Sequence, residues 1–169
     1  VSTALTRLAK GSVLGLRGPF GRGWPIEAAR GRDIIVMVGG LGLAPVRSLL
    51  LTLLRERDAF GRVTLLYGAR SPADLLYRRE SQQWRSRGRI AVEVTVDHAD
   101  SNWEGHVGVV TRLVRRAAFD PASTLAYVCG PEAMMRFSAY ALEDAGVAAT
   151  SIHLSTERNM QCAIGHCGH

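Results

Sequence analysis

The sequence of 169 residues is poor in cysteine, aromatic residues and lysine, and it has no long hydrophobic run. Three cysteines are too few for a disulfide-bonded scaffold, and an odd number without an export signal indicates a reducing compartment, so we expect a cytoplasmic protein. The longest apolar block, residues 41–54, is interrupted by Arg47, Ser48 and Thr52, so it falls short of the roughly 18–20 apolar residues of a membrane span. Apolar residues still make up 47% of the chain, which excludes a disordered or collagen-like protein and allows one domain with a real core.

The formal net charge of +6 comes from arginine, because Lys10 is the only lysine. The arginines are spread along the chain with acidic residues between them. Their densest group, Arg85, Arg87 and Arg89, is not interleaved with the aromatic residues that single-strand binding favours. We therefore expect no nucleic-acid partner. A basic surface suits docking to an acidic partner protein, where charge mainly speeds the encounter.

From residue 33 onwards, short apolar runs alternate with longer helix-like segments. The predicted strands are residues 33–38, 62–68, 90–96, 124–129 and 152–154. The predicted helices are residues 45–58, 71–87, 108–118 and 131–145. This alternation indicates βαβ units, so the predicted fold class is α/β, a three-layer α/β/α arrangement around a five-stranded parallel sheet.

Residues 1–27 differ from this pattern. A helix-like segment at 4–8 and a short predicted strand at 12–16 precede a glycine- and proline-rich run at 18–25, which is typical of a loop between folding units. We expect residues 1–27 to be the end of a preceding domain with a linker, 28–156 the main domain, and 157–169 the start of a further segment. The chain, which opens with Val1, is then part of a longer protein.

The first candidate site is the glycine-rich turn that follows the predicted strand 33–38. It consists of Gly39, Gly40, Leu41, Gly42, Leu43, Ala44 and Pro45. Glycines here let the backbone approach a phosphate, and the N-terminus of the next helix offers free N–H groups and partial positive charge. The spacing is not G-x-G-x-x-G, because proline stands where that pattern would begin its helix. A turn that only reverses the chain would need glycines too.

A second turn of the same kind follows the predicted strand 124–129. It consists of Cys129, Gly130, Pro131 and Glu132. A buried cysteine is most often part of the core, and Gly-Pro is an ordinary way to begin a helix. Ligands of open α/β sheets bind beyond the carboxyl ends of the strands, so we predict that both turns face one crevice at that edge.

The end of the chain carries a third candidate site, for a metal centre. Cys162 and Cys167 have the first interval of the plant-type [2Fe–2S] pattern, whose third cysteine would fall at position 170. A zinc site formed with His166 and His169 is an alternative, and two free thiols are another. The residues alone do not separate these three interpretations.

Together these motifs resemble the ferredoxin–NADP reductase superfamily, over essentially the whole chain. The resemblance is closest to the branch with the gamma subunit of nickel–iron hydrogenases, the corresponding flavoprotein of anaerobic sulfite reductase and the electron-transfer subunit of dihydroorotate dehydrogenase. It implies an FAD-binding β-barrel before the nucleotide domain, of which residues 1–27 are a remnant, and a [2Fe–2S] segment after it. It also implies hydride transfer between NAD(P)H and FAD, one-electron transfer to the cluster, and a redox partner subunit of the hydrogenase, sulfite reductase or dihydroorotate dehydrogenase type.

The resemblance also assigns residues. It implies that Ser2, Thr3, Gly18 and Pro19 contact FAD. It implies nicotinamide-nucleotide contacts at the first glycine turn, at the Cys129–Glu132 turn, and at Gly68, Arg70 and Asp97. The implied catalytic residues are Cys129, packed beside the nicotinamide, and Glu157, a polar group near the flavin or else a solvated carboxylate. The implied cluster ligands are Cys162 and Cys167.

The chain departs from the family pattern in two places. Most of the barrel, with its flavin-gripping segment, is missing, and so are the last two cluster cysteines, so we expect activity only from the complete protein. Asp97 and His98 stand where relatives that prefer NADP commonly have serine and arginine. A carboxylate accepts a hydrogen bond from the ribose 2′-OH of NAD and repels a 2′-phosphate, although Arg70 could reach one. The negative charge of Asp97 therefore favours NAD over NADP. The alternatives to an enzyme are a nucleotide-sensing module without flavin and a zinc-stabilised adaptor.

Overall fold

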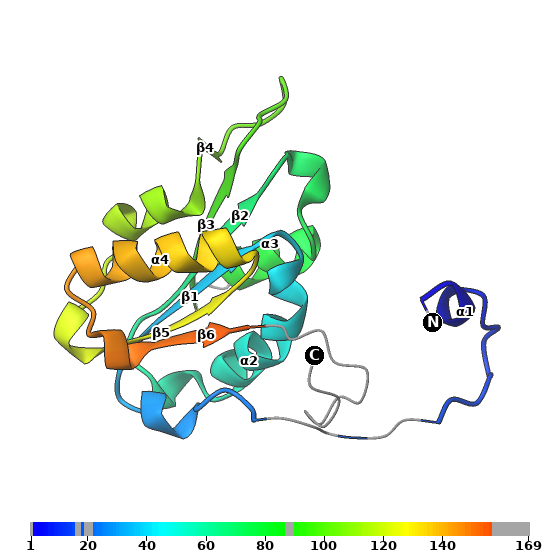
Figure 1. The fold of residues 1–169 in the computed structure, drawn as a ribbon, viewed down its shortest axis with the longest axis horizontal. Coiled ribbons are helices and arrows are strands. Elements are labelled where there is room, and N and C mark those ends of the chain that lie inside the picture. Colours follow the sequence, from blue (N-terminus) through cyan, green and yellow to red (C-terminus); the bar gives the residue numbers. More distant parts are fainter. Residues whose placement is uncertain (1, 16–17, 19–21, 87–89, 157–169) are drawn as a thin grey trace. The chain divides into compact units, whose positions relative to one another are not determined.

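The central sheet is built from the apolar runs of the sequence. A computed structural model, which describes residues 2–15, 18, 22–86 and 90–156, contains a six-stranded sheet in the order β4-β3-β2-β1-β5-β6 (Figure 1). Its strands are β1 (Asp33–Gly39), β2 (Val63–Ala69), β3 (Ala91–Val96), β4 (His106–Val107), β5 (Thr124–Cys129) and β6 (Ile152–Ser155). Every neighbouring pair is parallel. The α/β fold with a parallel sheet is therefore confirmed.

The sheet has one strand more than the five predicted. The additional strand, β4, pairs only His106 and Val107 with Thr95 and Val96 of β3. Two residues without an apolar run give no signal in the sequence. They are held in place from outside the strand, because the Trp103 indole N–H donates to the His106 carbonyl at 3.0 Å.

Both faces of the sheet are covered, which produces the three predicted layers (Figure 1). The helices α2 (Leu43–Arg55) and α3 (Arg78–Ser86) cover one face, and α4 (Glu132–Asp144) and the 3₁₀ helix η5 (Val110–Arg116) cover the other. Alternate residues of β1 enter the two cores, since Val36 belongs to the core that contains Leu50 of α2, while Met37 belongs to the core that contains Leu113 of η5. Strands buried on both faces need continuous apolar runs. None of the described helices is long and apolar enough to cross a membrane.

Two predicted helices differ from those observed. The predicted helix 71–87 begins only at Arg78, because Pro72–Asp74 form a 3₁₀ turn and Tyr77 adopts a left-handed φ of +48°. The predicted helix 108–118 is the 3₁₀ helix Val110–Arg116. Its valines and threonine are β-branched and lose side-chain freedom in an α-helix, so local propensity gives an α-helix little support there.

The described part of the N-terminal segment, residues 2–15, 18, 22 and 23, belongs to a separate unit, while Trp24–Glu157 form the unit that contains the sheet. The helix α1 (Ser2–Thr6) begins two residues before the predicted segment 4–8. The predicted strand 12–16 is wrong for its described residues 12–15, which form no strand and are exposed. A strand without a neighbour leaves its backbone groups unpaired, so four extended residues alone gain nothing from that conformation. Leu16 lies outside the described residues.

The chain enters the sheet domain through an aromatic contact with β5. The Trp24 and Tyr127 rings meet edge to face with centroids 5.3 Å apart, and His153 of β6 stacks on Tyr127 at 5.7 Å. The Tyr127 hydroxyl donates a hydrogen bond of 3.0 Å to the Pro25 carbonyl. The buried ring of Tyr127 therefore anchors the entering segment to β5.

This anchor predicts a loss of stability in base. Burial raises the pKa of Tyr127 to about 12, with the charge of Arg32 acting in the opposite direction, whereas an unfolded tyrosine ionises near pH 10. The stabilisation is therefore complete below about pH 10 and is lost as pH rises towards 12, because the unfolded chain gives up its proton first. We expect the free energy of unfolding of Tyr127→Phe to fall less than that of the wild type between pH 9 and 11.5, measured by urea unfolding. Equal pH dependence in the two proteins would contradict this assignment.

Candidate functional site

The first glycine turn leads from β1 into α2. Gly40 has a φ of +52°, a left-handed conformation that glycine adopts without steric cost. After the 3₁₀ turn Gly40–Gly42, α2 begins at Leu43, two residues earlier than predicted. Pro45 lies in the first turn of this helix, where its missing N–H removes no hydrogen bond. Leu41 is 79% exposed, so the turn presents its tip to solvent.

The second glycine turn leads from β5 into α4. Cys129 is the last residue of β5 and pairs in register with Val38 of β1, so it lies beside the end of the central strand. It is buried, with 6% of its surface exposed. Gly130 and Pro131 follow, and Glu132 begins α4 with an exposed side chain.

The two turns lie against each other at the carboxyl edge of the sheet, as the parallel topology predicts. A Cβ atom on Gly42 would lie 2.4 Å from the Cys129 carbonyl oxygen and 2.7 Å from its carbon. A Cβ on Gly130 would lie 3.1 Å from the Gly39 nitrogen and 2.9 Å from the Met134 sulfur. Glycine is thus required at Gly42 by backbone contact. The two strand ends therefore meet backbone to backbone at the edge where parallel α/β sheets bind ligands.

Two opposite charges follow the neighbouring strands β2 and β3. Arg70 comes directly after β2 and Asp97 directly after β3, and both side chains are exposed. The backbone ladder continues past the strands, because the Asp97 N–H donates to the Ala69 carbonyl at 3.0 Å and the His98 N–H to the Arg70 carbonyl at 2.8 Å. No ion pair of Arg70 or Asp97 is found within the described part of the chain. Arg70 and Asp97 therefore follow neighbouring strands at the carboxyl edge of the sheet, and their contacts with a nucleotide stay predictions.

Gly68, another predicted nucleotide contact, has a packing reason to be glycine. It is a buried residue of β2, and a Cβ atom there would lie 2.8 Å from the Cβ atom of Val110. The absent side chain lets η5 approach the sheet. A contact between Gly68 and a nucleotide stays a prediction.

A group of polar contacts between the glycine turn and α3 was not predicted from the sequence. Tyr67 of β2 accepts a hydrogen bond from the Leu76 N–H at 2.9 Å and donates one to the Gly40 carbonyl at 3.4 Å. Arg47 of α2 binds both carboxylate oxygens of Glu80 of α3, at 3.0 and 3.2 Å. A tyrosine near the end of a mostly apolar strand, and an arginine that interrupts an apolar helix, are the signals that could have revealed them.

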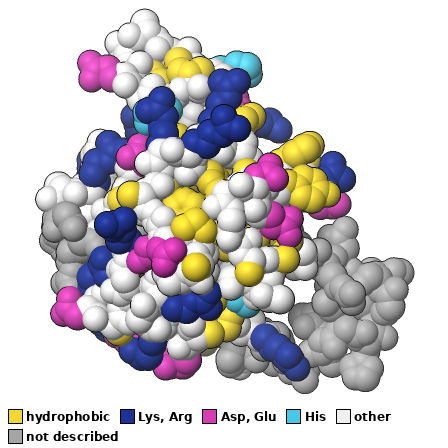
Figure 2. Space-filling view, turned by 90° about the vertical axis from the view of Figure 1, so that its left-hand side faces the viewer, with side chains coloured by type: hydrophobic (Ala, Val, Ile, Leu, Met, Phe, Trp, Pro, Cys, Tyr) yellow, Lys and Arg dark blue, Asp and Glu magenta, His cyan; other side chains and the backbone are white. Residues whose placement is uncertain are grey.

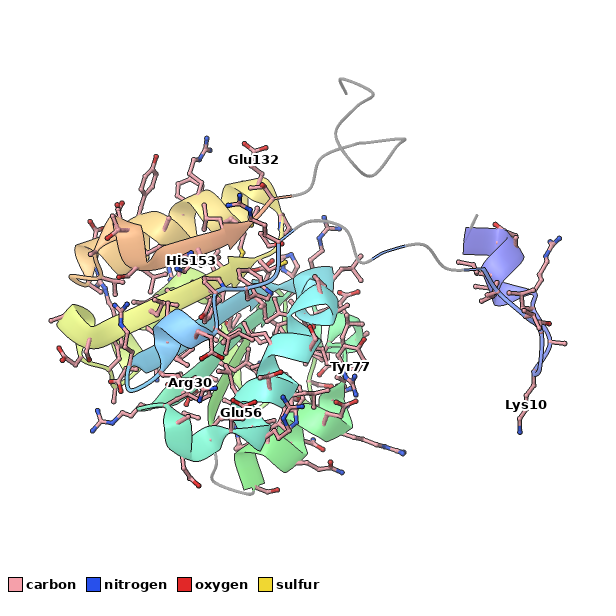
Figure 3. The ribbon with its side chains drawn as sticks, turned by 90° about the horizontal axis from the view of Figure 1, so that it is seen from below. Lys10, Arg30, Glu56, Tyr77, Glu132 and His153 are labelled. Atoms are coloured by element: carbon pink, nitrogen blue, oxygen red, sulfur yellow. The ribbon has the colours of Figure 1, made fainter. Side chains whose placement is uncertain are left out.

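The ring of Tyr77 completes this group. The Arg47 guanidinium carbon lies 5.3 Å from the Tyr77 ring centroid, and the carboxylate of Glu80 raises the pKa of Arg47. Figure 3 shows Tyr77 near the beginning of α2, and Arg30 and Glu56, which form an ion pair at 2.9 Å, near its end.

The remaining predicted site residues lie either in the other unit of the chain or outside the described residues. Ser2 and Thr3 lie in α1, and Gly18 has a φ of +151°; all three belong to the other unit of the chain. Pro19, Glu157, Cys162 and Cys167 lie outside the described residues. Among the residues that are described, no group of three histidine, cysteine or acidic side chains could hold a metal ion.

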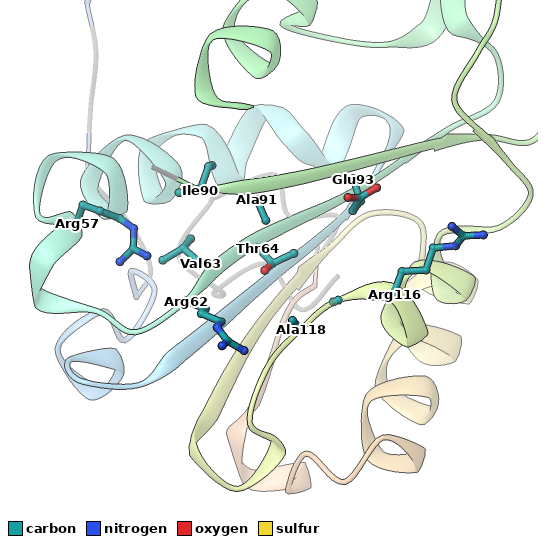
Figure 4. A pocket seen from close by; sticks show the side chains of 10 residues that line it. Arg57, Arg62, Val63, Thr64, Ile90, Ala91, Glu93, Arg116 and Ala118 are labelled. Atoms are coloured by element: carbon teal, nitrogen blue, oxygen red, sulfur yellow. The ribbon is translucent and has the colours of Figure 1, made fainter. Parts of the chain in front are cut away.

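A hollow of about 290 Å³ lies at the opposite edge of the sheet, near the first residues of β2 and β3 (Figure 4). Arg57 and Arg62 flank Val63 at one end of it, and Arg116 and Glu93 lie at the other. Because parallel sheets bind ligands at their carboxyl edge, this hollow is separate from the candidate site. On the face shown in Figure 2, basic and acidic side chains are interspersed.

Comparison with known proteins matches residues 36–139 to the family of oxidoreductase NAD-binding domains. The chain is 33% identical to sulfhydrogenase 2 subunit gamma of Pyrococcus furiosus, over 96% of this chain and 60% of that subunit. It is 36% identical to the probable dihydroorotate dehydrogenase B (NAD(+)), electron transfer subunit, of Methanocella arvoryzae, over 98% of this chain and 58% of that one. The chain thus spans about 60% of the length of these curated relatives.

Among solved structures, the chain is similar in fold to the CS-b5R domains of human Ncb5or in the NAD+ form. The TM-score is 0.78 at 21% sequence identity, covering 91% of this chain and 45% of that one. At this identity the similarity concerns the fold, the parallel sheet with helices on both faces.

Proposed function

Since the chain belongs to the family of oxidoreductase NAD-binding domains, within the ferredoxin–NADP reductase superfamily that its motifs predict, we propose that it is the nucleotide-binding part of an electron-transfer subunit. The complete subunit passes electrons between NAD(P)H, FAD and a [2Fe–2S] cluster, to or from a partner enzyme. The observation that carries the proposal is the direct contact between the turns at Gly42 and Cys129. It forms a backbone surface at the edge where parallel α/β sheets bind nucleotides.

In this proposal the first glycine turn binds the pyrophosphate of a dinucleotide, and the second turn binds its nicotinamide end. The first turn and the N-terminus of α2 offer backbone N–H groups and partial positive charge to a pyrophosphate. The missing side chain of Gly42 lets the backbone of the first turn approach the Cys129 carbonyl, so the two turns lie together at this edge. Cys129, Gly130, Pro131 and Glu132 form the wall for the nicotinamide end. A bound nicotinamide supplies the hydride chemistry, and the chain supplies position and exclusion of water.

Flavin and cluster enter the proposal through the family resemblance of the motifs, and the names of the relatives are compatible with an electron-transfer role. One of them is named an electron transfer subunit of a dihydroorotate dehydrogenase, and another a subunit of a sulfhydrogenase. The proposal assigns Ser2, Thr3, Gly18 and Pro19 to FAD. It assigns Glu157 to the surroundings of the flavin and Cys162 and Cys167 to the cluster. Because the chain spans about 60% of those relatives, these sites are completed by the rest of the protein.

The experiment is an anaerobic titration of the complete protein with NADH and then NADPH, following flavin and iron–sulfur absorbance together. We expect one nucleotide to bleach both absorbance bands, and iron with sulfide to be present. Binding without bleaching of either band would overturn the electron-transfer proposal in favour of nucleotide sensing. Zinc in place of iron and sulfide would overturn the cluster assignment in favour of a zinc-stabilised adaptor.

A further inference from the structure

The hydroxyl group of Tyr67 joins two segments that are far apart in the sequence. The ring is buried in the core between the sheet and α2, with 1% of its surface exposed. Its oxygen accepts the hydrogen bond from the Leu76 N–H at 2.9 Å, and its proton is donated to the Gly40 carbonyl at 3.4 Å. One atom therefore connects the first glycine turn with the segment that precedes α3.

The bond to Gly40 determines which way a backbone N–H of the turn points. The Gly40 carbonyl accepts from the Leu43 N–H and from Tyr67, so it is directed towards the body of the domain. In a trans peptide unit the N–H of the following residue points the opposite way from the carbonyl. The Leu41 N–H is therefore directed away from Tyr67, and Leu41 itself is 79% exposed. An outward N–H at the tip of a strand–helix turn is the group that an anion requires.

The hydrogen bond from Tyr67 matters because the residue it holds, Gly40, is a glycine. Glycine reaches left-handed and right-handed backbone conformations with similar ease, so Gly40 at a φ of +52° is not held by its own geometry. A turn that must be ordered at the moment of binding loses affinity by the entropy of that ordering. Burial raises the pKa of Tyr67, so the hydroxyl keeps its proton and remains a donor at neutral pH.

We infer that Tyr67 is a positioning residue, whose hydroxyl holds the Gly40–Gly42 turn in the conformation that receives the pyrophosphate of a nicotinamide dinucleotide. The inference rests on the proposed function, because it concerns the ligand of the same edge. Tyr67 need not touch the ligand. It acts through the Gly40 peptide, and through Leu76 it couples the turn to the loop after Arg70.

The test compares Tyr67→Phe with Tyr127→Phe in the complete protein. Both variants keep a buried ring and remove one hydroxyl that donates to a backbone carbonyl, but the Tyr127 hydroxyl binds Pro25 rather than the glycine turn. The measurements are the dissociation constants of NADH and ADP-ribose, the KM and kcat for flavin reduction, and the unfolding temperature. ADP-ribose contains the pyrophosphate and lacks the nicotinamide, so it isolates the contribution of the turn.

We expect Tyr67→Phe to weaken both ligands about fivefold, the effect of one net hydrogen bond, and Tyr127→Phe to change them by less than about twofold. KM should rise while kcat stays the same, since the turn holds ground state and transition state alike. Tyr67→Phe should lower the unfolding temperature somewhat more than Tyr127→Phe, because the Tyr67 hydroxyl also accepts the Leu76 N–H and that hydrogen bond is lost as well. Wild-type affinity in Tyr67→Phe, or equal loss in the two variants, would overturn the inference and leave the proposed function standing. A wild-type protein that binds neither ligand would instead overturn the proposed function together with the inference.

Discussion

Replacing Gly42 by alanine is expected to weaken nucleotide binding by about a hundredfold or more. The new Cβ atom would lie 2.4 Å from the Cys129 carbonyl oxygen, 2.7 Å from the carbonyl carbon and 3.0 Å from the Gly130 Cα atom. All three are backbone atoms at the end of a buried central strand, so none can rotate away as a side-chain tip could. One of the two turns must move, and the surface that they share opens. Overpacking of this kind also costs about 1–3 kcal/mol of folding stability.

The matched control is Gly39→Ala, in the same turn. Gly39 has an ordinary extended φ of −126°, and its Cβ would meet the Met134 sulfur at 3.3 Å. Methionine is flexible and can yield. We expect this variant to lose much less NADH affinity than Gly42→Ala, because a small shift of one side chain costs well under about 1.4 kcal/mol. The measurements are NADH binding by fluorescence and thermal unfolding. If Gly42→Ala binds NADH as tightly as Gly39→Ala, the contact between the turns is not what forms the site.

Replacing Asp97 by serine is expected to shift the ratio of NADPH to NADH affinity by about tenfold or more towards NADPH. The carboxylate follows β3, and its backbone is fixed by the 3.0 Å hydrogen bond to Ala69, so serine can take its place without moving the edge. Removing the negative charge ends the repulsion of a ribose 2′-phosphate. Arg70, which follows the neighbouring strand and is exposed, then has an anion to bind.

Glu104→Gln is the control for charge alone. Glu104 is an exposed acid in the segment between β3 and β4, and its replacement removes the same formal charge at a different place. We expect the NADPH to NADH ratio of this variant to stay within about twofold of the wild type, because the proposal gives Glu104 no contact with the ribose and salt screens interactions between exposed charges. Competitive titration of the complete protein with both nucleotides measures the ratios. An unchanged ratio in Asp97→Ser would show that Asp97 does not contact the ribose.

The strands of the sheet were predictable because burial on both faces leaves a continuous apolar run. All five runs predicted as strands of the sheet domain are strands, whereas β4 has two residues and depends on the Trp103 hydrogen bond at His106, which no local pattern reveals. The predicted α-helix at 108–118 is a 3₁₀ helix because packing decides the winding of a segment with weak helix propensity. The isolated strand predicted at 12–16 fails, for residues 12–15, for lack of a neighbour.

The candidate site was predictable to the same extent. Gly42 and Cys129 are remote in the sequence, yet parallel strands end at one edge, so the alternation of strands and helices predicts that both turns face that edge. Their direct contact depends on β1 and β5 being neighbours in the sheet, which only the structure shows. Tyr67 was not predictable as a site residue. A tyrosine fits a core strand equally well, and the direction of its hydroxyl towards Gly40 depends on the packing of α2, α3 and β2 together.

Local composition therefore accounts for the alternation of buried strands and helices, for the positions of the two glycine turns, and for the charged residues Arg70 and Asp97 after β2 and β3. Because parallel strands end at one edge, the sequence also predicts that these features lie at the same edge of the sheet. Three other features come from tertiary packing: Gly42 must be glycine, Gly68 makes room for Val110, and Tyr67 tethers Gly40. They depend on differences of about an ångström in how closely segments remote in the chain approach each other. A close-packed interior sets these distances through all of its contacts at once.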